Sequence, residues 1–134
     1  MTFQRMLILC LVLFVPMLPA QAAASPPIND AAALQGVKEG KGVFLIDFSD
    51  AKKTAFYLEI IKGTHAGLIR QGVKPSFVIV YIGPTVRFLT TAPDGELELE
   101  QGDALKAIAE RVKELDQLGV RQEICAIATK VFKV

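Results

Sequence analysis

The chain has 134 residues, 51% of them hydrophobic, and its 15 Lys and Arg residues nearly balance its 14 Asp and Glu residues. This length suits one compact domain rather than two. The formal net charge of +1 excludes both the basic surplus expected of a nucleic-acid-binding protein and an acidic tail that would attract a cationic partner.

The first 24 residues have the features of a removable export signal. Arg5 provides the positive start, residues 6–17 form a short apolar block, and small residues follow, with cleavage expected near Ala22 or Ala24. We therefore expect an exported, periplasmic protein. Loss of the leader removes Arg5 and leaves the mature chain formally neutral.

A membrane anchor is the alternative interpretation of this segment. The apolar block is shorter than the roughly 20 residues that span a bilayer, and Pro16 and Pro19 interrupt its end. We expect no stable membrane span after cleavage. Residues 25–41 are then expected to form a tether with a short helical turn, and residues 42–134 the folded domain.

The cysteines limit the chemistry of the mature chain. Cleavage removes Cys10 and leaves Cys125 alone, which excludes an intramolecular disulfide. Zinc is not expected, because only His65 and Cys125 are strong ligands and no spacing motif joins them. No nucleic-acid partner and no metal are predicted.

Three apolar runs predict three β-strands, over residues 42–48, 76–83 and about 120–126. The first two are apolar at nearly every position, which is typical of parallel strands buried on both faces. The run over 76–83 is the clearest, and it is expected to be central in the sheet.

Helices are predicted between these strands. Ser49 and Asp50 are expected to cap a helix over residues 52–71, and apolar spacing predicts a second helix over 104–118. Residues 85–90 are expected to make a short helical turn. Residues 92–101, with alternating glutamates, are interpreted as an exposed loop.

The order strand, helix, strand, helix, strand predicts an α/β fold. Such an order is typical of a parallel sheet joined by right-handed crossovers, with helices on the sheet faces. Ligands of these folds collect at the carboxyl ends of the strands. This rule selects residues 47–49, 83–87 and Cys125.

Cys125 is the candidate reactive group at that edge. A cation lowers a thiol pKa, and Arg87 could supply it if its loop folds toward the third strand. A helix over residues 126–132 would also favour the thiolate. Thr85 adds a hydroxyl to the same edge. The alternative is that Cys125 packs as a small buried hydrophobe.

Four segments resemble the DsrE/DsrF-like family. They are Val43–Asp47, the helix that ends at Gly72, Phe77–Gly83, and Leu118–Ala126 with Cys125 five residues after Val120. The resemblance spans roughly residues 42–128.

The resemblance implies a small DsrE-like α/β fold, assembly into homo-oligomers or hetero-oligomers, and in some members a cysteine that carries sulfur as a persulfide between proteins. The carrier role would map onto Cys125, and Gly83 matches the glycine that ends the second strand. No metal or organic cofactor is implied. The family continues through another helix and strand, whereas nine residues follow Cys125 here.

Three functional hypotheses remain open at this point. The protein could relay sulfane sulfur on Cys125 together with a donor or acceptor protein, with Gly83, Thr85 and Arg87 as binding residues. It could instead be a non-enzymatic oligomeric binding module with a structural cysteine. Cys125 could also join two subunits through a disulfide.

Overall fold

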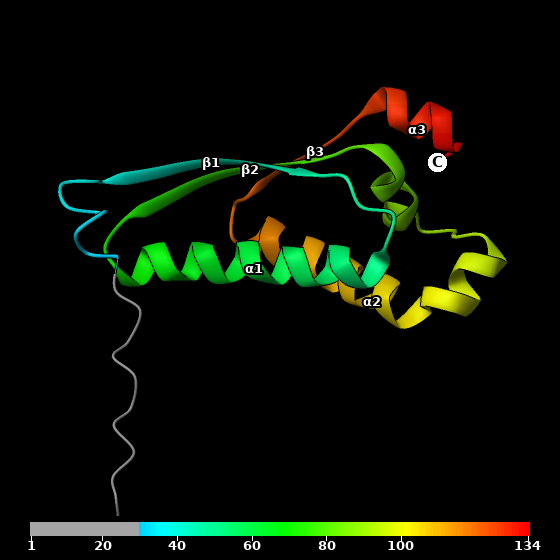
Figure 1. Ribbon diagram of the computed structural model, residues 1–134, viewed down its shortest axis with the longest axis horizontal. Helices are drawn as coiled ribbons and strands as arrows, with labels where there is room; N and C mark the ends of the chain where they lie inside the picture. Colours follow the sequence, from blue (N-terminus) through cyan, green and yellow to red (C-terminus); the bar gives the residue numbers. More distant parts are fainter. Residues whose placement is uncertain (1–29) are drawn as a thin grey trace, which may run out of the picture.

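The computed structural model describes residues 30–134, so the expected leader lies outside the described residues. Three parallel strands form one sheet in the order β1-β2-β3 (Figure 1). The strands are β1 (Glu39–Ile46), β2 (Lys74–Tyr81) and β3 (Arg121–Ile124). The helices are α1 (Ala51–Arg70), the 3₁₀ helix η1 (Gly83–Leu89), α2 (Gly95–Gln117) and α3 (Ala126–Phe132). The predicted α/β class with a small parallel sheet is confirmed.

Both long helices lie on the same face of the sheet (Figure 1). Each crossover, first through α1 and then through α2, moves one strand further in the same direction. Two crossovers of the same hand that advance in one direction must pass over the same face. The prediction of helices on the sheet faces therefore holds for one face only, because the strand order never reverses.

The uncovered face corrects the prediction that β1 is buried on both sides. Exposure alternates along β1, and Val43 and Leu45 expose 74% and 60% of their surface. Ile46 on the opposite face is fully buried, and Phe44 packs edge-on against Phe77 of β2. The alternation is that of a strand with one solvated side.

Helix α2 begins within the segment predicted to be a loop. The side chain of Asp94 accepts a hydrogen bond from Leu97 N at 2.8 Å, which is an N-cap, and Leu97 is buried. A kink at Gln101, with φ −130° and ψ 15°, separates this first part from the rest of α2. The Oε1 atom of Gln101 accepts a hydrogen bond from Ala51 N at 3.0 Å. The side chain at the kink thus provides a partner for a backbone N–H in the first turn of α1, which has none within the helix.

Four charged side chains join α1 to α2. Lys62 Nζ contacts Glu114 Oε2 at 2.9 Å and Glu59 Oε2 at 3.0 Å. Arg111 contacts Glu59 through Nε and Glu114 through Nη1. The hydrogen bond from Lys62 lowers the pKa of the Glu114 carboxyl, and the hydrogen bond to Glu114 raises the pKa of Lys62. This partly exposed network links the two helices beside the buried apolar contacts of Leu58, Ile61, Ile108 and Leu115.

Candidate functional site

The carboxyl ends of the three strands meet at one edge of the sheet. Ile46, Tyr81 and Ile124 are paired across the three strands, so the residues that follow them emerge side by side. Asp47 follows β1, and Cys125 follows β3. This edge therefore gathers the segments that the sequence selects.

Cys125 lies where β3 ends and α3 begins. Its N–H donates to Tyr81 O at 2.9 Å, and its C=O accepts from Thr129 N at 3.0 Å. The residue is partly exposed and its thiol is free. The backbone is therefore held on both sides of Cys125, and the residue as a whole is only partly buried, unlike a cysteine sealed in a core.

Gly83 begins η1 with φ +54°, a conformation that side chains rarely adopt. A Cβ atom at this position would clash with the Oδ1 atom of Asp47. The glycine therefore allows the Asp47 carboxylate to approach the backbone after β2. Its role here is steric, because it makes room for a side chain of the neighbouring strand's loop.

Thr85 is fully buried, and its hydroxyl is already engaged. Thr85 Oγ1 accepts from Phe48 N at 2.6 Å and donates to Phe48 O at 3.0 Å. No part of this side chain is exposed to a ligand. The predicted binding role of Thr85 is therefore replaced by a positioning role, since the hydroxyl holds the connection between β1 and α1.

Arg87 is directed to another partner than Cys125. Its Nη2 atom lies 3.4 Å from Asp94 Oδ2, and the residue shares a cavity with Phe132 and Val134. Cys125 lies at the opposite end of α3, a helix of seven residues that spans about 10 Å. The structure thus gives Arg87 a contact with Asp94, and the role of Arg87 as the cation for the thiol stays a prediction. Asp94 has a lowered pKa, chiefly because its carboxylate accepts the Leu97 N–H and then because it pairs with Arg87.

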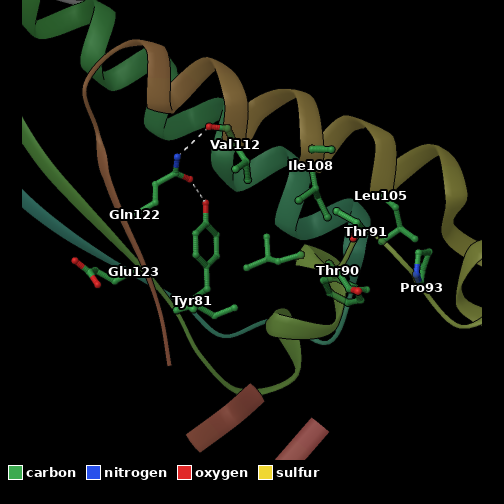
Figure 2. Close-up of a pocket in the computed structure, with 13 residues that line it drawn as sticks. Tyr81, Thr90, Thr91, Pro93, Leu105, Ile108, Val112, Gln122 and Glu123 are labelled. Carbon is green, nitrogen blue, oxygen red and sulfur yellow. Dashed lines mark hydrogen bonds between the residues drawn. The ribbon is translucent and has the colours of Figure 1, made fainter. Parts of the chain in front are cut away.

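An apolar cavity of about 410 Å³ lies between β3 and α2 (Figure 2). It is on the covered side of the sheet, and Cys125 is not among the residues that line it. Its lining comes from β2, η1, the segment after η1, α2 and β3, and includes Tyr81, Leu105, Ile108, Val112, Gln122 and Ile124.

Tyr81 and Gln122 form the polar group in this cavity wall. The Tyr81 hydroxyl donates to Gln122 Oε1 at 2.6 Å, and Gln122 Nε2 donates to Val112 O at 2.9 Å (Figure 2). Burial raises the pKa of the Tyr81 phenol, so the phenol stays protonated and remains a donor. The pair thus crosses from β2 through β3 to α2.

The sequence interpretation missed this cavity. Tyr81 stands in an apolar run and looks like any core residue, while Gln122 looks like a surface residue of a short strand. The available signal was the alternation of Val120, Gln122 and Ile124, which places the amide on the same side as two apolar residues.

Comparison of the chain with protein-family models, with characterised proteins and with solved structures gives no match. Over residues 30–134, no group of three or more His, Cys, Asp or Glu side chains is arranged to hold a metal ion. No helix of that same range is long and apolar enough to cross a membrane.

Proposed function

We propose that the protein is an exported, DsrE-like member of its fold class that binds sulfane sulfur as a persulfide on Cys125. The observation that carries the proposal is the position of this residue. It is a partly exposed residue with a free thiol at the carboxyl end of β3, on the edge where ligands of parallel sheets bind. The resemblance to the DsrE/DsrF-like family supports the same assignment, because the carrier role of that family maps onto Cys125.

The proposed step is an exchange between a persulfide and a thiolate. The Cys125 thiolate attacks the outer sulfur of a donor persulfide, a new S–S bond forms on Cys125, and the donor leaves as its thiolate. The reverse exchange passes the sulfur to an acceptor thiol. No further oxidant or reductant is needed, because one S–S bond replaces another.

Arg87 is not part of this proposal, because it pairs with Asp94. The backbone N–H and C=O of Cys125 are also engaged, with Tyr81 O and Thr129 N, so the proposal assigns stabilisation of the sulfur to an incoming partner protein. A relay of this kind depends on a donor or acceptor protein that approaches the carboxyl edge of the sheet.

To test the proposal, the protein is treated with a low-molecular-weight persulfide, alkylated and digested with trypsin, and the masses of the peptides are measured. Cleavage after Arg121 and Lys130 releases a peptide that contains Cys125 and excludes Cys10. We expect this peptide to gain the mass of one sulfur, and Cys125→Ser to gain none. An unmodified wild-type peptide, under conditions where the donor modifies a free model thiol, would refute the proposal.

A second function is favoured by the apolar cavity between β3 and α2. In this alternative the protein is a non-enzymatic binding module that encloses an apolar group, and Cys125 serves only the packing of α3. Ala109 lines the cavity from α2, so Ala109→Trp should fill it and abolish binding of an apolar fluorescent dye. Glu110→Trp, at an exposed position on the same helix that does not line the cavity, is the matched control. Equal dye binding by both variants would exclude the cavity as the site.

A further inference from the structure

The sheet surface opposite α1 and α2, here called the open face, carries an ordered set of side chains. The register of the strands and the alternation of exposure assign them. They are Glu39, Lys41, Val43 and Leu45 of β1, Lys74, Ser76, Val78 and Val80 of β2, and Arg121 and Glu123 of β3. Figure 1 shows α3 beyond the carboxyl ends of the strands and on the open-face side of the sheet, so the strands themselves are not covered by it.

Charge on the open face changes sign along the strands. Lys41, Lys74 and Arg121 lie toward the amino-terminal ends and outweigh Glu39. Glu123 lies toward the carboxyl ends, where the exposed Asp47 follows β1. On β1, Val43 and Leu45 separate Lys41 from Asp47, whereas on β3 Arg121 and Glu123 lie in the same rows as Val78 and Val80 of β2.

This pattern is centred on a single row across the sheet. Phe44, Ile79 and Gln122 are paired in that row. Arg121 and Glu123 flank the row on β3. On β1, Lys41 and Asp47 lie three residues before and after it, and the aliphatic residues lie one residue before and after it.

Two copies related by a two-fold axis along this row would be complementary. The axis reverses the strand direction, so Arg121 meets the partner's Glu123 and Lys41 meets the partner's Asp47. It also places Val43 over the partner's Leu45, and Val78 over the partner's Val80. A two-fold interface of this kind uses the same surface on both subunits.

We propose that two copies of this chain associate by packing open face against open face, with antiparallel strands about 10 Å apart as in a β-sandwich. The interface removes Val43 and Leu45 from water. It is independent of the sulfur chemistry proposed above. In this arrangement the two Cys125 residues lie at opposite ends of the interface, about 20 Å apart along the strands, so no disulfide joins them.

The first test measures molecular mass by sedimentation as a function of concentration. We expect the wild type to dimerise, in the presence or absence of reductant, and Cys125→Ser to dimerise equally. Leu45→Glu should be monomeric, because it introduces a charge into the aliphatic centre. Leu99→Glu is the matched control, since Leu99 is 88% exposed on α2, away from the open face, and it should remain dimeric.

The second test examines the antiparallel arrangement. Arg121 and Glu123 are exposed and pair within one chain at 3.1 Å. Arg121→Glu and Glu123→Arg should each weaken dimerisation about tenfold, because like charges then meet across the interface. The double variant exchanges the two charges and should return to within about threefold of the wild type. Lys113→Glu, on the outer surface of α2, should have no effect.

Several outcomes would overturn the proposal. They are a wild-type monomer at the highest soluble concentration, a dimer that is lost on reduction or in Cys125→Ser, and a dimer that survives Leu45→Glu. A double charge exchange that stays as weak as the single variants would also exclude this axis. Circular dichroism and thermal melting of each variant verify that the fold is retained, so that loss of the dimer reports on the interface.

Discussion

The Thr85 hydroxyl holds both backbone groups of Phe48, accepting from its N–H at 2.6 Å and donating to its C=O at 3.0 Å. One buried side chain from η1 thereby closes the connection between β1 and α1, although 37 residues separate the partners in sequence. The start of η1 and the carboxyl edge of the sheet are thus joined by two hydrogen bonds.

Thr85→Val should destabilise the protein by about 2 kcal/mol, because it keeps the shape of the side chain and leaves the two Phe48 backbone groups without their partner. Thr85→Ser keeps the hydroxyl and should lose less. Urea unfolding followed by circular dichroism measures the difference. Equal stability of the valine and serine variants would mean that the methyl packing, rather than the hydroxyl, accounts for this threonine.

Gly83→Ala should cost about 3 kcal/mol, from the strained positive φ and from the clash with Asp47. Asp47→Ala in the same chain should recover part of this loss, leaving about 1–2 kcal/mol of backbone strain. The four proteins of this double-mutant cycle are compared by urea unfolding. Strictly additive effects would contradict the close approach of the two residues.

Gly63→Ala, within α1, should raise the stability of the protein, whereas Gly83→Ala should lower it. Nothing lies within 4 Å of a Cβ built at this position, and the backbone is helical. The substitution should therefore stabilise the protein by about 0.5–1 kcal/mol, because alanine loses less backbone entropy in a helix. A rise in the urea midpoint is the expected result, and a fall would show that α1 needs its glycine.

Stability should fall at high pH because of Tyr81. Burial raises the pKa of this phenol in the folded protein, whereas in the unfolded chain it ionises near pH 10. The folded state then holds a proton that the unfolded state releases, so stability is complete below about pH 10 and declines above it. Tyr81→Phe should be less stable at neutral pH by about 1 kcal/mol, owing to the lost hydrogen bond to Gln122, but its stability should decline less between pH 10 and 11.5. If the stability of the wild type and of Tyr81→Phe fell equally steeply with pH, that would count against a buried Tyr81 phenol.

Stability should also fall at acidic pH because of Glu114. Its pKa is lowered, first by the hydrogen bond from Lys62, so the stabilisation is complete above about pH 4.3 and is lost as the pH falls through the folded value. Glu114→Gln should make the stability of the protein less dependent on pH in the acidic range and less sensitive to salt. Glu100→Gln, an exposed residue of the same helix without an ion pair in the described part of the chain, should leave both unchanged. Thermal melts from pH 5 to pH 3 provide the comparison.

Local sequence signals accounted for most of the elements. The helix predicted over 52–71 is observed over Ala51–Arg70, capped by Asp50 as expected, and the helix considered after Cys125 is α3. There are two exceptions: β1 begins at Glu39, inside the predicted tether of residues 25–41, and residues 92–101 were expected to form a loop because of their Pro, Gly and alternating glutamates. Asp94 instead starts a helix with Glu96 and Glu98 in its first turn, an arrangement that the helix dipole favours.

The candidate site was predictable only in part. The strand order brings Asp47, Gly83 and Cys125 to one edge, as expected of any parallel sheet. The partners of Arg87 and Thr85 were not predictable, because a side chain's nearest neighbour depends on distances between segments far apart in the chain. In the structure Arg87 contacts Asp94, and Thr85 is hydrogen-bonded to Phe48.

The amino-acid pattern alone predicts the alternation of strands and helices, the helix caps and the thiol after the third strand. These features depend on neighbours only a few residues apart in the chain. Only the tertiary structure determined that α1 and α2 share one face of the sheet. Apolar strand sequences are compatible with cover on either side, and the direction of each crossover decides which side receives a helix. The uncovered valines and leucine of the open face result from that direction.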